Sequence, residues 1–206
     1  MILYAVDTSV VITAPNHKDL NIRANLLFHN INTWFQNNLL LLNLDKTLYA
    51  DFFSNHTVKR MGSIQFNNTN LTNAPLIKFL GLMIDSNLTW NYQVDLILRR
   101  LLSSCYALNY VKYTLPIDIL KLIYFANIQS IMSYGIIFWG ASTTASKVFI
   151  LQKPLRIIYN IKPRDSCRKL FRDNHIMTFY SLYLYSLTLF VVNNKGFFDP
   201  NNTFQT

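Results

Sequence analysis

Hydrophobic positions follow two different patterns, short runs within the first 90 residues and long helical stripes after them. Between His17 and Asn37 the apolar residues recur at i, i+3 and i+4 spacing, with polar residues between them. This periodicity predicts an amphipathic helix of about twenty residues. Asn37 and Asn38 suit its C-terminus, because Asn tolerates the left-handed backbone conformation that ends many helices.

Short runs of β-forming residues flank this helix. Two strands around Val6-Asp7-Thr8 are predicted at residues 2–5 and 9–13. Four more strand-like runs follow the helix, at 39–42, 47–53, 58–66 and 76–85. The order of elements predicts one helix packed on a mainly antiparallel sheet.

Helical periodicity replaces these runs after Trp90. One apolar stripe consists of Val94, Ile97, Leu98, Leu101, Cys105 and Leu108. Arg99 and Arg100 lie at its edge or beyond it. Pro116 suits the start of the next helix, whose apolar face is expected to include Ile119, Ile123, Ala126 and Ile128. Two more helices are predicted at 144–160 and 166–192, and Pro154 should kink the first or mark its start. The whole pattern predicts an α+β fold with two regions, 1–90 and 91–206.

Charge separates the same two regions. The formal net charge is +9, yet residues 1–95 carry six Lys/Arg and six Asp, whereas residues 96–206 carry thirteen Lys/Arg and four Asp. A basic half beside a neutral half indicates a surface for a nucleic-acid backbone or an anionic membrane. The positive charge is densest between residues 153 and 172, where solvated helix faces are the alternative explanation.

Metal ligands and disulfides are not indicated. The two cysteines, Cys105 and Cys167, have no metal-ligand spacing, and the four His are scattered. No signal peptide is recognised at the start of the sequence. We therefore expect an intracellular protein of the nucleus or cytoplasm that uses no cofactor of its own.

Two uncharged stretches raise the alternative of a small membrane protein. Residues 122–146 are long enough to cross a bilayer, and residues 176–192 also carry no charge. Polar residues such as Asn127 and Gln129 dilute the hydropathy of the first stretch, so the pattern favours a protein that does not cross a membrane.

Six blocks, in order along nearly the whole chain, carry a resemblance. They are LYAVDTSVVI (3–12), NLLLLNLDKTLYADF (38–52), FLGLMIDSNLTW (79–90), SYGIIFWG (133–140), LQKPLRIIYN (151–160) and SCRKLF (166–171). The chain resembles the C-terminal part of the reverse transcriptase of non-LTR retrotransposons, in particular the jockey-like group of LINE elements. The resemblance implies that residues 1–90 form the end of a polymerase palm and that residues 91–206 form the thumb and the region after it.

The resemblance also implies a damaged catalytic site. In this family of RNA-directed DNA polymerases, three carboxylates hold two Mg²⁺ ions. Aligning Tyr4, Ala5 and Thr8 with the family hairpin puts Val6 at the first Asp of the pair and Asp7 at the second. Because Val offers no oxygen ligand, Asp7 would form only a weak, incomplete metal site.

Other parts of the polymerase are not found in the sequence. The upstream catalytic strand, the fingers and the nucleotide pocket would precede the first block, so we expect a truncated enzyme that is inactive by itself and has no small-molecule substrate. Lys46 matches the Lys thought to protonate departing pyrophosphate. Without a nucleotide site it would be only an exposed residue in a turn.

Nucleic acid is the partner that the resemblance implies. Leu80 and Gly81 match the turn called the primer grip, although a plain β-turn explains them equally well. In a thumb, Lys and Arg hold the backbone of an RNA–DNA or template–primer duplex. The candidates are Arg99, Arg100, Lys112, Arg156, Arg164, Arg168, Lys169 and Arg172. Nearby Tyr and Trp could stack on bases, while most aromatic residues are expected in the core.

A second hypothesis fits the same residues. The chain would then be a non-catalytic nucleic-acid-binding module derived from the thumb. The sequence leaves open whether the reading frame is an expressed gene, a pseudogene fragment or part of a longer protein. It also leaves open any sequence preference and the oligomeric state.

Overall fold

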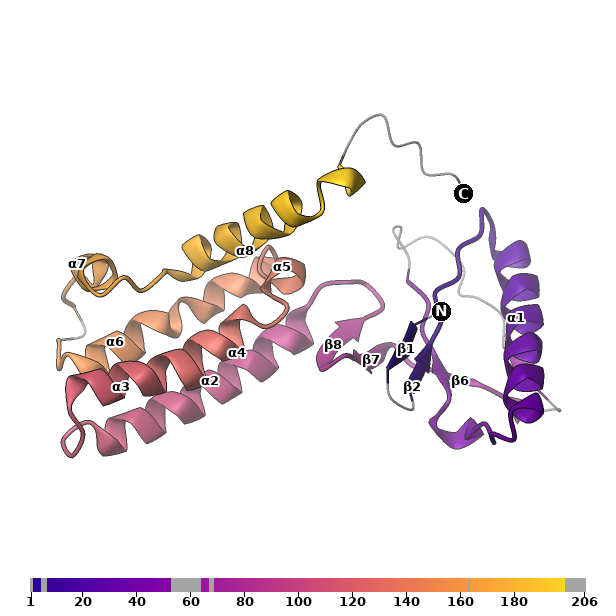
Figure 1. Cartoon of the computed structure of the whole chain (residues 1–206), viewed down its shortest axis with the longest axis horizontal. Helices are drawn as coiled ribbons and strands as arrows, with labels where there is room; N and C mark the ends of the chain where they lie inside the picture. The colour runs from indigo at the N-terminus through magenta and orange to yellow at the C-terminus, as the bar shows by residue number, and fades with distance from the viewer. Residues whose placement is uncertain (1, 5–6, 53–63, 67–68, 163, 199–206) are drawn as a thin grey trace. The chain divides into compact units, whose positions relative to one another are not determined.

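Strands and one long helix precede Asp85, and helices follow it (Figure 1). The computed structural model describes residues 2–4, 7–52, 64–66, 69–162 and 164–198. The chain divides into two compact units. Met1–Phe79 and Ile84–Leu88 form the sheet unit, while Leu80–Met83 and Thr89–Thr206 form the helical unit. The predicted α+β class is confirmed, although residues 80–83 belong with the helices.

Strands of the sheet unit pair two by two among the described residues. β1 (Ile2–Tyr4) lies antiparallel to β2 (Asp7–Ser9), and β4 (Gln65–Phe66) lies antiparallel to β5 (Thr69–Asn70). In contrast, β3 (Leu48–Tyr49) is parallel to β6 (Thr72–Asn73). The run predicted as one strand at 76–85 is the hairpin of β7 (Leu76–Phe79) and β8 (Leu82–Asp85).

The strand predicted at 39–42 is wrong. Leu39 has φ 56°, and residues 40–43 have no regular structure. Leu39 and Leu41 are about fully exposed, at 95% and 96%, so no neighbouring strand offers them an apolar face. Most of the strand predicted at 58–66 lies outside the described residues.

α1 (His17–Asn37) matches the predicted amphipathic helix. Its first turn is capped by Asn16, whose Oδ1 accepts a hydrogen bond of 2.9 Å from the Asp19 backbone N–H. The helix ends at Asn37 as predicted, but Leu39 rather than an Asn takes the left-handed conformation. Its core contact is small, since Ala24 packs with Ile64 and Leu71.

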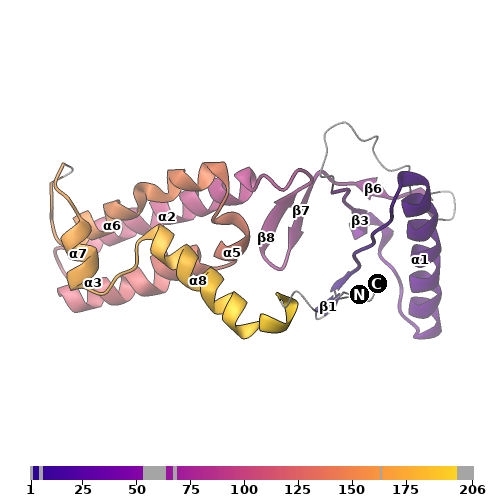
Figure 2. The same ribbon diagram turned by 90° about the horizontal axis from the view of Figure 1, so that it is seen from above.

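The helices of the helical unit are α2 (Asn91–Val111), α3 (Ile117–Tyr124), a π-helix (Phe125–Gln129), α4 (Ser130–Ser133), α5 (Ile136–Trp139), α6 (Gln152–Ile158), α7 (Arg168–Asp173) and α8 (Phe179–Asn193). α2, α6 and the continuous segment from α3 to α4 lie side by side (Figures 1 and 2). Three 3₁₀ segments occur at Leu44–Lys46, Thr143–Leu151 and Lys195–Phe197.

Prolines mark helix starts as the sequence suggests. Pro116 caps α3, and Pro154 lies in the first turn of α6, where its missing N–H has no intrahelical partner to lose. The helix predicted at 144–160 is therefore 3₁₀ in its first half. The helix predicted at 166–192 divides into α7 and α8, because His175 adopts φ 54° between them.

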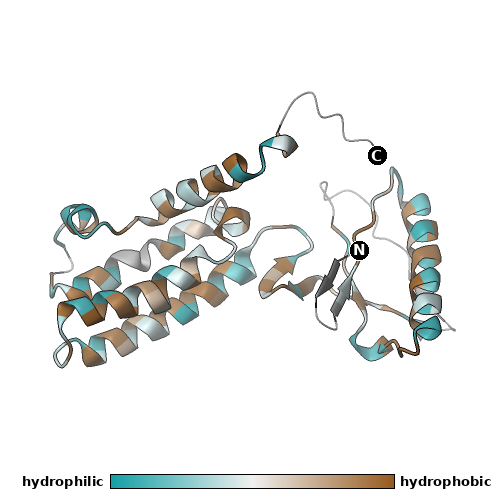
Figure 3. Cartoon of the chain, in the orientation of Figure 1, coloured by the Kyte–Doolittle hydropathy of each residue, from teal (hydrophilic) through white to brown (hydrophobic). Residues whose placement is uncertain are grey.

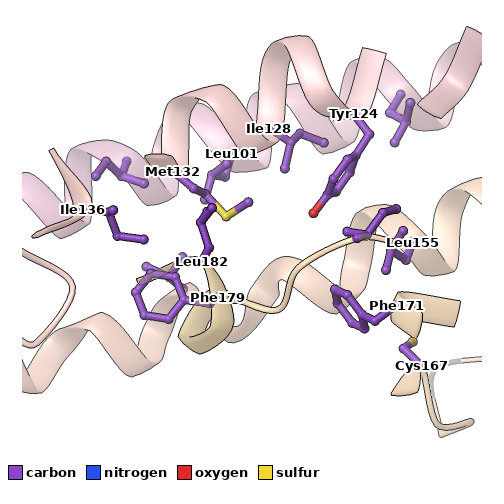
Figure 4. Close-up of a cluster of buried hydrophobic side chains, with 14 of the residues drawn as sticks. Leu101, Tyr124, Ile128, Met132, Ile136, Leu155, Cys167, Phe171, Phe179 and Leu182 are labelled. Carbon is purple, nitrogen blue, oxygen red and sulfur yellow. The ribbon is translucent and has the colours of Figure 1, made fainter. Parts of the chain in front are cut away.

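The core of the helical unit confirms one predicted stripe and corrects another. The α2 stripe is buried as predicted, apart from the half-buried Leu98. The face predicted for the helix after Pro116 is only partly right. Ile128 is buried and Ile123 is half-buried, but Ile119 and Ala126 are exposed. The buried positions lie four residues apart and are Leu120, Tyr124, Ile128 and Met132, the last three of which Figure 4 labels.

The four-residue spacing of these buried positions explains why the sequence predicted this face only in part. Three steps of four residues would drift about 120° round a regular α-helix. The π-helix at Phe125–Gln129 inserts a wider turn that compensates for this drift. Burial raises the pKa of Tyr124, and the neighbouring Cys105 raises it further. Burial also raises the pKa of Cys105, against an opposing effect of Lys153.

Apolar positions do not build a membrane-spanning helix in the described chain. Figure 3 shows hydrophobic and hydrophilic positions alternating along α2. The uncharged stretch 122–146 is interrupted at Gly135, whose φ is 62°. No helix among the described residues is long and apolar enough to cross a membrane.

Candidate nucleic-acid interface

Asp7 is the first residue of β2, and its backbone pairs with that of Tyr4. This differs from the predicted hairpin, whose second strand begins at Ser9. Val6 lies outside the described residues. Within the described ranges, no three His, Cys, Asp or Glu residues lie close enough to hold a metal ion.

Lys46 ends the 3₁₀ turn Leu44–Lys46, and its side chain is exposed. Asn43 closes this turn from both sides. Its Oδ1 accepts a hydrogen bond of 3.2 Å from the Lys46 N–H, and its carbonyl oxygen accepts one of 2.7 Å from the Thr47 hydroxyl. The local hydrogen bonds thus give the Asn, Lys and Thr of this block structural roles in a turn.

Leu80 and Gly81 are the two central residues of the β7–β8 turn. Both have positive φ values, 45° and 81°, as a type I′ hairpin turn requires. The Tyr134 hydroxyl donates a hydrogen bond to the Leu80 carbonyl oxygen. A Cβ at Gly81 would lie 3.4 Å from the Tyr134 hydroxyl oxygen. Within the helical unit, one aromatic side chain therefore holds the turn.

Two of the blocks that carry the resemblance meet around this turn. Besides Tyr134 and Leu80, the ring of Trp90 stacks on that of Phe138 at 6.2 Å between centroids. Gly135 lies so close to Leu82 that a Cβ would be 2.8 Å from the Leu82 Cδ2. The structure therefore gives residues of blocks 79–90 and 133–140 a shared packing role.

The hairpin is also tied to α2. The Met83 N–H donates a hydrogen bond of 2.9 Å to the Oε1 of Gln93. Gln93 is only 3% exposed. A buried amide with a backbone partner holds the tip of β8 at the start of α2.

The candidate basic residues divide into three positions. Arg99 and Arg100 are exposed in the middle of α2, and Lys112 follows its last turn. Exposed residues in α7 and the segment before it are Arg164, Arg168, Lys169 and Arg172. Arg156 of α6 is half-buried and donates a hydrogen bond to the Lys162 carbonyl oxygen. Arg156 thus helps to close the turn after α6, and its guanidinium is less accessible than the others.

The turn after α2 and helix α7 lie at the same end of the helical unit in both views (Figures 1 and 2). We call Lys112, Arg164, Arg168, Lys169 and Arg172 the basic end. Arg99 lies thirteen residues before Lys112, about 20 Å along a helix. Five of the eight predicted residues therefore belong to segments at one end of the helical unit, while Arg99 and Arg100 lie on a separate stretch of α2.

Acidic groups in the helical unit are mostly paired with cations. Asp173 lies 3.5 Å from Arg172, Asp118 lies 3.9 Å from Lys121, and Asp95 lies 3.9 Å from Lys147. Asp165 is the remaining acid within the described part of this unit. These exposed pairs add little stability, but each offsets one positive charge, and a clear excess of cations remains.

The sequence reasoning allowed Tyr and Trp near the cations to stack on bases, but it did not name the exposed tyrosines on α2. It expected most aromatic residues in the core. Tyr92, Tyr106 and Tyr110 are exposed by 64%, 77% and 80%, and Tyr113 in the next turn by 81%. Their spacing relative to Arg99, in steps of seven and four, was the signal that could have identified this face.

Comparison with known proteins adds no relative to this picture. No protein-family model, no curated protein and no solved structure matches the chain. The resemblance therefore depends on the six ordered sequence blocks alone.

Proposed function

We propose that this chain derives from the reverse transcriptase of a non-LTR retrotransposon and that its helical unit binds nucleic-acid backbones without polymerising them. Six ordered sequence blocks support the derivation.

The observation that carries the binding function is the excess of exposed cations on the helical unit. The basic end presents Arg164, Arg168, Lys169 and Arg172 to solvent. Among the described acids nearby, Asp173 is already paired with Arg172 and Asp118 with Lys121. Lys and Arg side chains in such a setting bind phosphates by displacing condensed counterions, largely without reading sequence.

Polymerisation is not part of the proposal. Val6 replaces the metal-binding Asp of the family pattern, and Asp7 alone would hold a divalent ion weakly. Lys46 lies in a turn whose hydrogen bonds involve Asn43 and Thr47. Asp7 and Lys46 are therefore vestigial in this proposal, and Mg²⁺ belongs to the intact family. The protein would bind its nucleic-acid ligand in the nucleus or cytoplasm.

Binding of an RNA–DNA duplex over a salt series tests the proposal. The full chain is titrated into a fluorescently labelled duplex, and anisotropy gives the association constant at each salt concentration. We expect the logarithm of this constant to fall linearly with the logarithm of salt concentration, by a slope of about 0.9 per neutralised phosphate. Failure to bind at low salt, or binding that does not respond to salt, contradicts the proposal.

A further inference from the structure

The outward face of α2 carries aromatic rings as well as charge. At 3.6 residues per turn, Tyr92, Arg99, Tyr106 and Tyr110 project within about 40° of one another. The buried stripe of α2, from Val94 to Leu108, lies on the opposite side of the helix. Burial of that stripe in the core therefore keeps these four side chains directed to solvent.

Large exposed rings need an explanation beyond packing. Tyr106 and Tyr110 are 77% and 80% exposed, although a Tyr ring is among the larger apolar surfaces that a protein can bury. Within the described chain, no hydrogen bond to either hydroxyl is found. Neither ring therefore contributes much to the stability of the helix, and both rings are accessible to a ligand.

Positive charge accompanies the rings. Arg99 lies seven residues from both Tyr92 and Tyr106, and Arg100 beside it is also exposed. After the last turn of α2, the Lys112 Nζ lies 4.7 Å from the centre of the Tyr113 ring. Asp95 is the one acid in the sequence of α2, and Lys147 pairs with it at 3.9 Å.

We infer that this surface binds single-stranded nucleic acid by stacking unpaired bases on its rings. We call it the tyrosine face, and it consists of Tyr92, Arg99, Arg100, Tyr106, Tyr110 and Tyr113. The inference rests on the proposed binding function and narrows its ligand. Rings on the outside of a helix can stack only on bases whose own faces are free, and these are the bases of single strands. The Arg and Lys side chains would contact the phosphates of the same strand.

A protein partner is the main competing occupant, because Tyr and Arg are also enriched in protein interfaces. A second copy of this chain fits poorly. Pairing two tyrosine faces would bring Arg99 and Arg100 of both copies together, and each chain carries a net charge of +9. Like charges would oppose that association, whereas the same charges attract a phosphate backbone.

Variants of two tyrosines test the inference in the full chain. Tyr106→Leu with Tyr110→Leu removes both rings and keeps apolar side chains, while Tyr106→Phe with Tyr110→Phe keeps the rings. Tyr180→Leu with Tyr185→Leu is the matched control, since these residues of the charge-free helix α8 are 49% and 54% exposed. Each protein is titrated into a labelled oligothymidylate strand and, separately, into a labelled RNA–DNA duplex.

We expect the Tyr106/Tyr110 leucine variant to lose about tenfold or more in affinity for the single strand, since each stacked base contributes substantially to binding. The phenylalanine variant and the α8 control should bind the strand like the unmodified chain. Duplex affinity and the far-UV circular dichroism spectrum should not change in any variant, which excludes unfolding as the cause.

The outcomes separate this inference from the proposed function. Duplex binding together with an unchanged strand affinity in the leucine variant overturns the inference and leaves the proposed function standing. Absence of binding to both ligands at low salt contradicts the proposed function itself. A dimer in sedimentation that the leucine variant dissociates assigns the face to a second copy and also overturns the inference.

Discussion

The Tyr134 hydroxyl donates a hydrogen bond to the Leu80 carbonyl oxygen, across 54 positions of sequence. Tyr134 is itself fixed, because the Trp139 Nε1 donates a hydrogen bond of 3.1 Å to its carbonyl oxygen. Trp139 is fully buried in the core of the helical unit. The chain of contacts therefore runs from the core through Trp139 and Tyr134 to the turn at Leu80.

Replacing Tyr134 by Phe should weaken this attachment. The variant loses one hydrogen bond and keeps the ring beside Gly81, so we expect the free energy of unfolding to fall by about 1 kcal/mol. Urea unfolding followed by far-UV circular dichroism measures the change. Tyr185→Phe is the control, because that hydroxyl belongs to a 54% exposed residue. Equal stabilities of the two variants would show that the Tyr134 contact contributes nothing.

Gly135→Ala should destabilise the helical unit for two reasons. The residue has φ 62°, and its new Cβ would lie 2.8 Å from the Leu82 Cδ2. We expect a loss of about 2 kcal/mol or more in the free energy of unfolding. In a Leu82→Ala background the steric part disappears, so the same substitution should cost only about 1 kcal/mol. An equal cost in both backgrounds would rule out the Leu82 clash.

Alkaline pH should destabilise the helical unit through Tyr124 and Cys105. Burial raises the pKa of both groups, so both stay protonated in the folded chain. Unfolding returns them to ordinary values of about 10 and about 8.5. The unfolded chain then releases protons first, and stability that is complete at neutral pH falls as the pH rises above about 8.5. Urea unfolding at neutral and alkaline pH measures this fall.

Tyr124→Phe is the variant that tests the cause of this pH dependence. Its slope above about pH 10 should be smaller, because one of the two protons is absent. The Tyr124 hydroxyl is buried and has no hydrogen-bond partner in the described structure, so neutral stability should not fall. Tyr159→Phe is the contrasting control. Its hydroxyl donates to the Asn174 Oδ1, and its loss should cost about 1 kcal/mol while the alkaline slope persists.

Neutralising the basic end should reduce the salt dependence of duplex binding. Replacing Arg164, Arg168, Lys169 and Arg172 by Gln removes four cations that we assign to phosphate contacts. The slope of the logarithm of the association constant against that of salt should fall by up to about 3.6. A matched control replaces the same number of cations in the sheet unit, namely Lys18, Arg23, Lys46 and Lys78. A similar slope change in the control would place the phosphate contacts elsewhere.

Primer extension on an RNA template with Mg²⁺ or Mn²⁺ should stay at background. Val6→Asp should not restore it, because one added carboxylate beside Asp7 leaves the three-carboxylate site incomplete. Incorporation of labelled nucleotide into the primer is the measurement, and an intact reverse transcriptase of a non-LTR retrotransposon is the positive control. Extension by the unmodified chain would contradict the proposed loss of polymerase activity.

Patterns among neighbouring residues correctly predicted those helix ends and faces that depend on interactions within a single helix. The start of α3 after Pro116, the end of α1 at Asn37 and the buried stripe of α2 follow from proline chemistry, capping and periodicity. The predicted apolar face after Pro116 was only partly right, because a π-helix changes the period within the helix. The strand at 39–42 was wrong because a run of leucines has no strand to pair with there.

For the candidate site, the sequence supplied the residue types and the tertiary structure sorted them. The sequence predicted Arg156 as a phosphate-binding residue like the other cations. In the structure, its hydrogen bond to the Lys162 carbonyl oxygen gives it a role in a turn. The sequence allowed Tyr and Trp near the cations to stack on bases, but it did not identify which tyrosines of α2 are exposed. Periodicity gives the relative positions of Tyr106 and Arg99 on a helix, but only packing decides which face is buried.

By itself, the sequence determined the α+β class, the division into a neutral and a basic half, and the order of the six blocks. Each is a property of neighbouring residues or of composition, so no folded contact is needed to read it. Only the tertiary structure decided that Tyr134 holds Leu80, that the turn after α2 and helix α7 lie at one end of the helical unit, and that the tyrosine face is exposed. These relationships join residues distant in sequence, and packing of the core selects them.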